Sequence, residues 1–95
     1  IITSEKLKQY FSITQEALDQ AKDKFDPNRE QEAADCYDLA SRYYQDAQFF
    51  LEKKDDAVLA FAALNYAHGW LDAGARIGLF LVQDSRLFTV DGETK

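Results

Sequence analysis

Apolar residues recur along the chain at alternating intervals of four and three, which is the spacing of one face of an α-helix. The first such run covers residues 4–25, the second 27–53 and the third 56–82. Short polar stretches separate the runs, with the only proline, Pro27, at the first break and the acidic pair 55–56 at the second. The pattern therefore predicts three helices joined by short links.

Short links favour antiparallel neighbours, because each helix buries its apolar face against the next by turning back along it. We therefore predict an all-α fold, an antiparallel up-down-up three-helix bundle that forms a single helical domain over residues 1–95. The periodicity dissolves after Val82, so residues 83–95 are predicted as an irregular or extended C-terminal tail. Two interpretations of the apolar stretch 87–90 stay open, an extended segment over the bundle and simple disorder.

The third predicted helix lacks the polar side that a bundle helix normally turns to solvent. Only Asp56, Asp72 and Arg76 carry a charge in residues 56–82. Interior glycines lower helix stability, so their presence indicates that something approaches the backbone closely. An apolar helix face of this size favours self-association, most simply as a two-fold homodimer. The predicted interface residues are Gly69, Trp70, Ala73, Gly74, Ile77 and Gly78.

Two alternatives stay open for this face. In the first, the segment from Leu87 to Val90 folds back over it and the protein is a monomer. In the second, the face is a groove for an unknown protein partner. A membrane span is not expected, because Asp72 and Arg76 interrupt the only candidate stretch.

One polar cluster on the third helix is a candidate for chemistry: Asn65, His68, Asp72 and Arg76. The steps from His68 to Asp72 and from Asp72 to Arg76 are four residues each, so the three side chains share one side of the helix. An aspartate that orients an imidazole also serves general-base catalysis, but the pattern offers no nucleophile beside it. We interpret the cluster as a structural network and predict no catalytic residue. The alternative is a small-molecule-binding protein or an enzyme that uses these four residues.

Composition narrows the classes of partner and cofactor. The chain has 11 basic and 17 acidic residues, a net charge of -6, which disfavours binding to nucleic acid. One histidine and one cysteine, Cys36, cannot make a usual zinc site, so no metal or other cofactor is predicted. Cys36 lies between Asp35 and Asp38, an acidic setting that keeps a thiol unreactive. Residues 1–10 lack a signal-peptide core, so we expect a cytoplasmic protein, and the absence of methionine indicates that the native start lies elsewhere.

Three stretches carry a resemblance to a known family. Residues 63–80 read ALNYAHGWLDAGARIGLF, residues 42–47 read RYYQDA and are followed by FLEK at 50–53, and residues 87–90 read LFTV. Together they resemble archaeal domain-of-unknown-function family 357. The resemblance implies a small archaeal cytoplasmic protein with a three-helix bundle similar to the albumin-binding-domain-like folds. It implies no activity.

Overall fold

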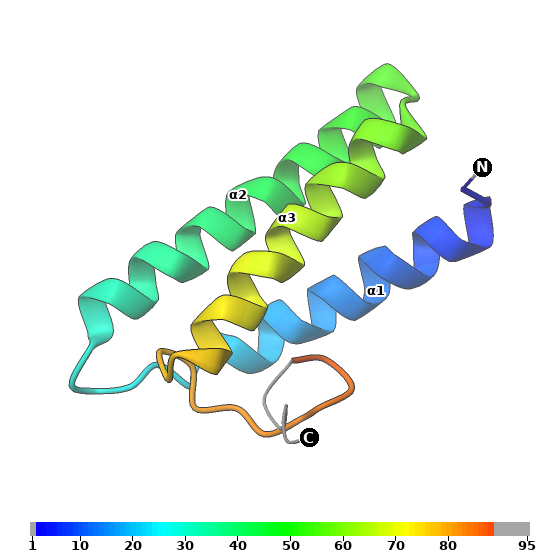
Figure 1. Ribbon diagram of the computed structural model, residues 1–95. Helices are drawn as coiled ribbons and strands as arrows, with labels where there is room; N and C mark the ends of the chain where they lie inside the picture. Colours follow the sequence, from blue (N-terminus) through cyan, green and yellow to red (C-terminus); the bar gives the residue numbers. More distant parts are fainter. Residues whose placement is uncertain (1, 89–95) are drawn as a thin grey trace.

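The chain forms three α-helices, and each runs antiparallel to the one before it (Figure 1). The computed structural model describes residues 2–88, and the helices are α1 (Ser4–Ala21), α2 (Glu30–Lys54) and α3 (Ala57–Arg76). This arrangement confirms the predicted all-α antiparallel bundle. Residues 89–95, including Thr89 and Val90 of the predicted tail segment, lie outside the described residues.

The first helix begins as the sequence predicts and ends earlier. Thr3 is the N-cap, and its hydroxyl accepts a hydrogen bond of 3.1 Å from the backbone N–H of Lys6. The predicted end at residue 25 is wrong, because α1 stops at Ala21. Beyond it the backbone pairs with the chain after α3: Leu81 N–H donates to the carbonyl of Lys24 and Phe25 faces Phe80 in an isolated antiparallel bridge.

The second helix begins at Glu30, three residues after the predicted start. The carboxylate of Asp26 accepts from the N–H of Asn28 and the carbonyl of Asp26 accepts from the N–H of Arg29, so a turn precedes the helix. At the other end, Asp55 takes the left-handed conformation with φ of 50° and ends α2. Asp56 then caps α3, since its carboxylate accepts a 3.0 Å hydrogen bond from the N–H of Leu59.

The third helix ends at Arg76, so the prediction of a helix to residue 82 is wrong. Gly78 adopts φ of 82°, a conformation that L side chains rarely take, and the chain turns there. The N–H groups of Leu79 and Phe80 both donate to the carbonyl of Gly74, which closes the helix end. Residues 77–88 then return as an irregular segment, which we call the C-terminal segment.

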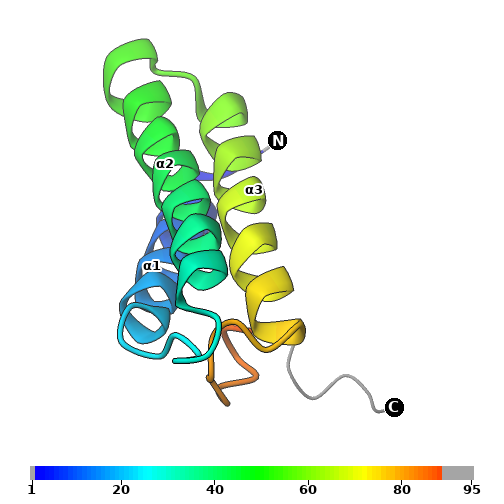
Figure 2. The same cartoon turned by 90° about the vertical axis from the view of Figure 1, so that its left-hand side faces the viewer.

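The core has two parts of different character. Helices α2 and α3 lie side by side along their length (Figure 2), and they meet through small buried residues: Ala33, Cys36, Ala40 and Ala47 on α2, and Ala60, Ala63, Ala67 and Gly74 on α3. Small side chains let two helices approach closely. Larger residues fill the space between the α2–α3 pair on one side and α1 with the C-terminal segment on the other. The C-terminal segment contributes five buried residues to this part of the core: Leu79, Phe80, Val82, Leu87 and Phe88.

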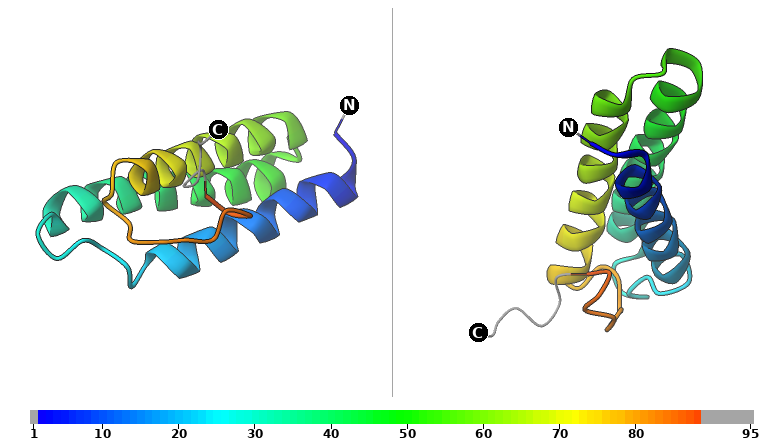
Figure 3. Two further views of the ribbon diagram at one scale, coloured as in Figure 1. Left: turned by 60° about the horizontal axis from the view of Figure 1, so that its bottom comes forward. Right: turned by 90° about the vertical axis from the view of Figure 1, so that its right-hand side faces the viewer.

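The C-terminal segment covers only one side of the bundle. Figure 3 shows it passing from the end of α3 towards α1. Leu87 and Phe88 pack in the same cluster as Leu18 and Leu71, so this part of the predicted tail lies over the bundle. The other side of α3 stays open to solvent, and it carries the candidate site.

Candidate functional site

The solvent-facing side of α3 and its C-cap is apolar along almost its full length. Its large members are strongly exposed: Tyr66 63%, Ile77 57% and Trp70 39% of their surface. Apolar groups of this size are normally covered by another surface. We call the exposed residues of this side the outward face; they are Val58, Leu59, Ala62, Asn65, Tyr66, Gly69, Trp70, Ala73, Arg76 and Ile77.

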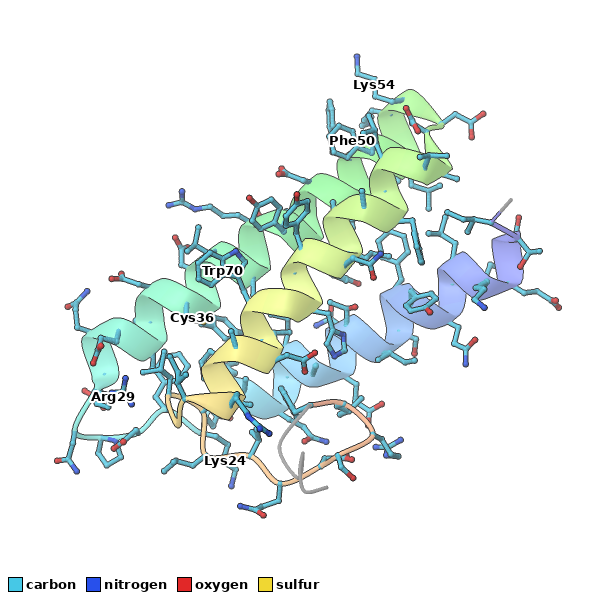
Figure 4. All side chains as sticks on the ribbon, viewed as in Figure 1. Lys24, Arg29, Cys36, Phe50, Lys54 and Trp70 are labelled. Carbon is cyan, nitrogen blue, oxygen red and sulfur yellow. The ribbon has the colours of Figure 1, made fainter. Side chains whose placement is uncertain are left out.

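A shallow groove of about 700 Å³ runs along the outward face where α3 borders α2. None of its lining residues is charged; they are Tyr43, Ala62, Asn65, Tyr66, Gly69, Trp70 and Ala73. The ring of Tyr66 stacks on the ring of Tyr43 from α2, with centroids 5.2 Å apart and planes at 20°. This contact fixes one wall of the groove. Figure 4 shows Trp70 on the side of α3 that is turned away from α1.

Of the six predicted interface residues, four lie on the outward face. Gly69, Trp70 and Ala73 line the groove, and Ile77 is exposed at the end of α3. A Cβ at Gly69 would meet nothing within 4 Å, so this mid-helix glycine leaves bare backbone at the surface. Packing within the chain therefore gives no reason for a glycine at position 69.

The other two predicted interface residues have roles inside the fold. Gly74 is buried, and a Cβ there would lie 2.4 Å and 2.7 Å from two ring carbons of Phe80. Its missing side chain lets Phe80 close over the end of α3. Gly78 supplies the positive φ that ends the helix. Close approach to glycine was a correct expectation for Gly74, but the approaching group belongs to the same chain.

The predicted polar cluster divides between two sides of α3. Nε2 of His68 donates a hydrogen bond to the carbonyl of Leu87, and the same nitrogen lies 3.9 Å from a carboxylate oxygen of Asp72. A carbonyl only accepts, so Nε2 carries the proton. Asn65 instead lines the groove, and Arg76 is exposed near the end of the helix. The geometry thus makes His68 an anchor for the C-terminal segment.

Sequence reasoning missed a second anchor for that segment. Asp84 accepts hydrogen bonds from Arg86 and from Gln20, the latter at 3.2 Å, and Arg86 also pairs with Glu16 at 3.0 Å. The bonds from Arg86 are the main cause that lowers the pKa of the Asp84 carboxyl, and the bond from Gln20 adds to it. The spacing Asp84-Ser85-Arg86 was a visible signal, but its partners on α1 are more than sixty residues away.

Cys36 is buried in the core. Its thiol donates to the carbonyl of Trp70 at 3.1 Å, and burial raises the pKa of the thiol. Residues 2–88 hold no group of three or more His, Cys, Asp or Glu side chains arranged to bind a metal ion. Over the same residues, no helix has the length and apolarity needed to cross a bilayer.

Comparison with protein families agrees with the resemblance noted in the sequence. The family model described as protein of unknown function (DUF357) matches residues 9–80, most of the chain. The chain belongs to the DUF357 family. In this DUF357 protein the matched region runs from α1 to Phe80, so it includes the turn at Gly78 and the closure of Phe80 over Gly74. No curated protein and no solved structure matches the chain.

Proposed function

We propose that this DUF357 protein is a non-enzymatic helical interaction module that forms a homodimer through the outward face of α3. The observation that carries the proposal is the exposure of Tyr66, Trp70 and Ile77 on a face whose groove has no charged lining residue. Covering large apolar side chains stabilises an association by roughly 25 cal/mol for each Å² removed from water. A second copy of the same face is the simplest cover.

The distribution of charge favours the outward face as the place where two copies meet. The chain has a net charge of -6, so two copies repel each other over most of their surfaces. The outward face contains no carboxylate, since its polar members are Asn65 and Arg76. Two copies that meet through this face keep their acidic surfaces apart. We also propose that the protein lies in the archaeal cytoplasm. Its single cysteine is a free thiol, and free thiols are usual in that reducing compartment.

The polar cluster supports a structural role more than a catalytic one. The Nε2 proton of His68 is committed to the carbonyl of Leu87, and the side chain is largely covered by the C-terminal segment. With the proton on Nε2, only Nδ1 of the ring could act as a base, and a base must be directed at a substrate. The groove, which has the room for a ligand, is lined by Asn65 alone among the four cluster residues.

The test is the mass in solution by size-exclusion chromatography with light scattering over a hundredfold dilution. We expect wild type to form a dimer that dissociates on dilution, with a dissociation constant on the order of micromolar, because a face one helix wide is at the small end of stable interfaces. Ala73→Arg places a charge in the groove and should leave a folded monomer. Ala34→Arg is the matched control, at an exposed alanine of α2, and should dimerise like wild type.

A wild-type chain that stays monomeric at millimolar concentration would overturn the proposal. So would equal loss of dimer in both arginine variants, because the effect would then not depend on the outward face. Circular dichroism of each variant checks that the helices are retained.

A further inference from the structure

The centre of the outward face repeats with the spacing of a coiled-coil seam. Six of its residues follow one another at steps of three, four, three, four and three; they are Leu59, Ala62, Tyr66, Gly69, Ala73 and Arg76. All six are exposed in the single chain. A seam of this kind packs against another helix, and here α2 and α1 already occupy the other sides of α3.

We propose that α3 pairs with α3 of a second copy in antiparallel orientation, with Tyr66 opposite Gly69 of the partner subunit. This inference rests on the homodimer of the proposed function and adds its geometry. The six seam positions are arranged symmetrically about a point between Ala67 and His68. A two-fold axis at that point sets residue 59 opposite residue 76, residue 62 opposite 73 and residue 66 opposite 69, and no seam position is left without a counterpart.

Side-chain size favours this register. Tyr66 has the largest side chain of the seam, and its ring is braced by Tyr43. Gly69 has none, and a Cβ there would touch nothing in its own chain. When Tyr66 lies opposite Gly69 of the partner subunit, its ring has room against the bare backbone of the glycine. The two-fold symmetry gives this contact twice in one dimer. The next layer sets Ala62 opposite Ala73, which are both small. A parallel pair would instead oppose Tyr66 with Tyr66 and leave Gly69 facing Gly69.

Charge favours the antiparallel orientation as well. Arg76 lies opposite Leu59 of the partner subunit, beside the N-terminal end of the partner's α3, where Asp56 of the partner subunit is the N-cap and Asp55 of the partner subunit precedes it. Each end of the seam therefore brings one arginine close to two carboxylates. A parallel pair would bring Arg76 next to Arg76, which repel each other.

Disulfide trapping tests the register. Ala62→Cys and Ala73→Cys are prepared separately, mixed at a concentration where wild type is dimeric, and oxidised with oxidised glutathione. Because a disulfide needs Cα atoms within about 7 Å, we expect a crosslink between the two different variants and little within either variant alone. Wild type is the control, since its buried Cys36 should give no crosslinked dimer.

A second measurement uses Gly69→Ala. In the single chain the new methyl group meets nothing, so the monomer should unfold at a higher temperature than wild type. The dimer should dissociate at least tenfold more readily, because in the dimer the methyl group faces Tyr66 of the partner subunit.

If a dimer forms but Ala62→Cys crosslinks with itself as well as it does with Ala73→Cys, the register is wrong and the proposed function stands. If Gly69→Ala dimerises as tightly as wild type, the proposed register is also wrong. If no dimer forms at all, the inference and the proposed function both fall.

Discussion

Replacing Gly74 with alanine tests the inference that the C-terminal segment can pack on α3 only because position 74 has no side chain. Gly74 is buried, and its carbonyl accepts hydrogen bonds from the N–H groups of both Leu79 and Phe80. A methyl group at this position would lie 2.4 Å and 2.7 Å from ring carbons of Phe80 and 3.0 Å from the sulfur of Cys36. Ordinary carbon contacts are about 3.5–4.0 Å, so the ring has to move by about 1 Å.

The ring of Phe80 has little room to move. It is 1% exposed, and the rings of Phe25 and Tyr37 lie with their centroids 5.7 Å and 6.4 Å away. Inserting a methyl group into a packed core of this kind typically costs about 1–3 kcal/mol. The gain in helix propensity from Gly to Ala offsets about 0.5–1 kcal/mol of that cost. The net cost then lies between about 0 and 2.5 kcal/mol, and we expect Gly74→Ala to lower the free energy of unfolding by about 1 kcal/mol, a fall in Tm of roughly 4–8 °C for a domain of this size.

The assay is urea and thermal unfolding followed by circular dichroism, at a protein concentration low enough to keep the chain monomeric. Gly69→Ala is the matched control, because it is the same substitution on the same helix with nothing within 4 Å, and it should raise the free energy of unfolding by about 0.5–1 kcal/mol. The two substitutions should thus change stability in opposite directions.

A double-mutant cycle with Phe80→Leu identifies the clash. In the Phe80→Leu background the smaller side chain leaves room, so Gly74→Ala should cost much less than in wild type. The reasoning is refuted if Gly74→Ala is as stable as Gly69→Ala, or if its cost is unchanged when Phe80 is replaced.

Three further substitutions test other parts of the fold. His68→Ala removes the donor to the carbonyl of Leu87 and should cost about 1–2 kcal/mol, with faster amide exchange at Leu87 and Phe88; unchanged exchange there would show that His68 does not anchor the segment. Thr14→Val replaces a buried hydroxyl that has no hydrogen-bond partner among the described residues, so it should raise the free energy of unfolding by about 1 kcal/mol in a urea titration, and a loss would contradict this. Asp84→Asn should destabilise the protein at neutral pH, because the lowered pKa of this carboxyl means that its ionised form stabilises the fold. That contribution is present above the ordinary aspartate range and disappears as pH falls through the lowered pKa, so the unfolding curves of Asp84→Asn and wild type should converge in acid; a difference that stays constant with pH would refute the role of the charge.

The sequence predicted the three helices because their apolar spacing is regular, but it placed two helix ends wrongly. At Gly78 the helical spacing continues to Val82, but the positive φ of Gly78 and the capping bonds to Gly74 end the helix, and Leu81 then bonds to the distant Lys24. Likewise, the backbone after Ala21 could have continued α1, but it bonds to the C-terminal segment instead. Periodicity records which residues are apolar and does not contain these long-range hydrogen bonds.

The candidate site was predictable in part. The low charge of the third helix identified the outward face, and Gly69, Trp70 and Ala73 lie in its groove. The sequence could not separate Gly69 from Gly74, because both are interior glycines of one helix and they differ only in what lies beside them. Nor could it assign His68 to the C-terminal segment, because its bond is to a backbone carbonyl, which every residue carries.

The most direct test of the central claim is the mass of the wild-type protein in solution as a function of concentration. Sedimentation equilibrium from about 1 µM to 1 mM spans the range in which a small interface associates. We predict a shift from the 10.9 kDa of one chain to twice that mass, and loss of the shift in Ala73→Arg but not in Ala34→Arg. A single species of 10.9 kDa over the whole range would contradict the account.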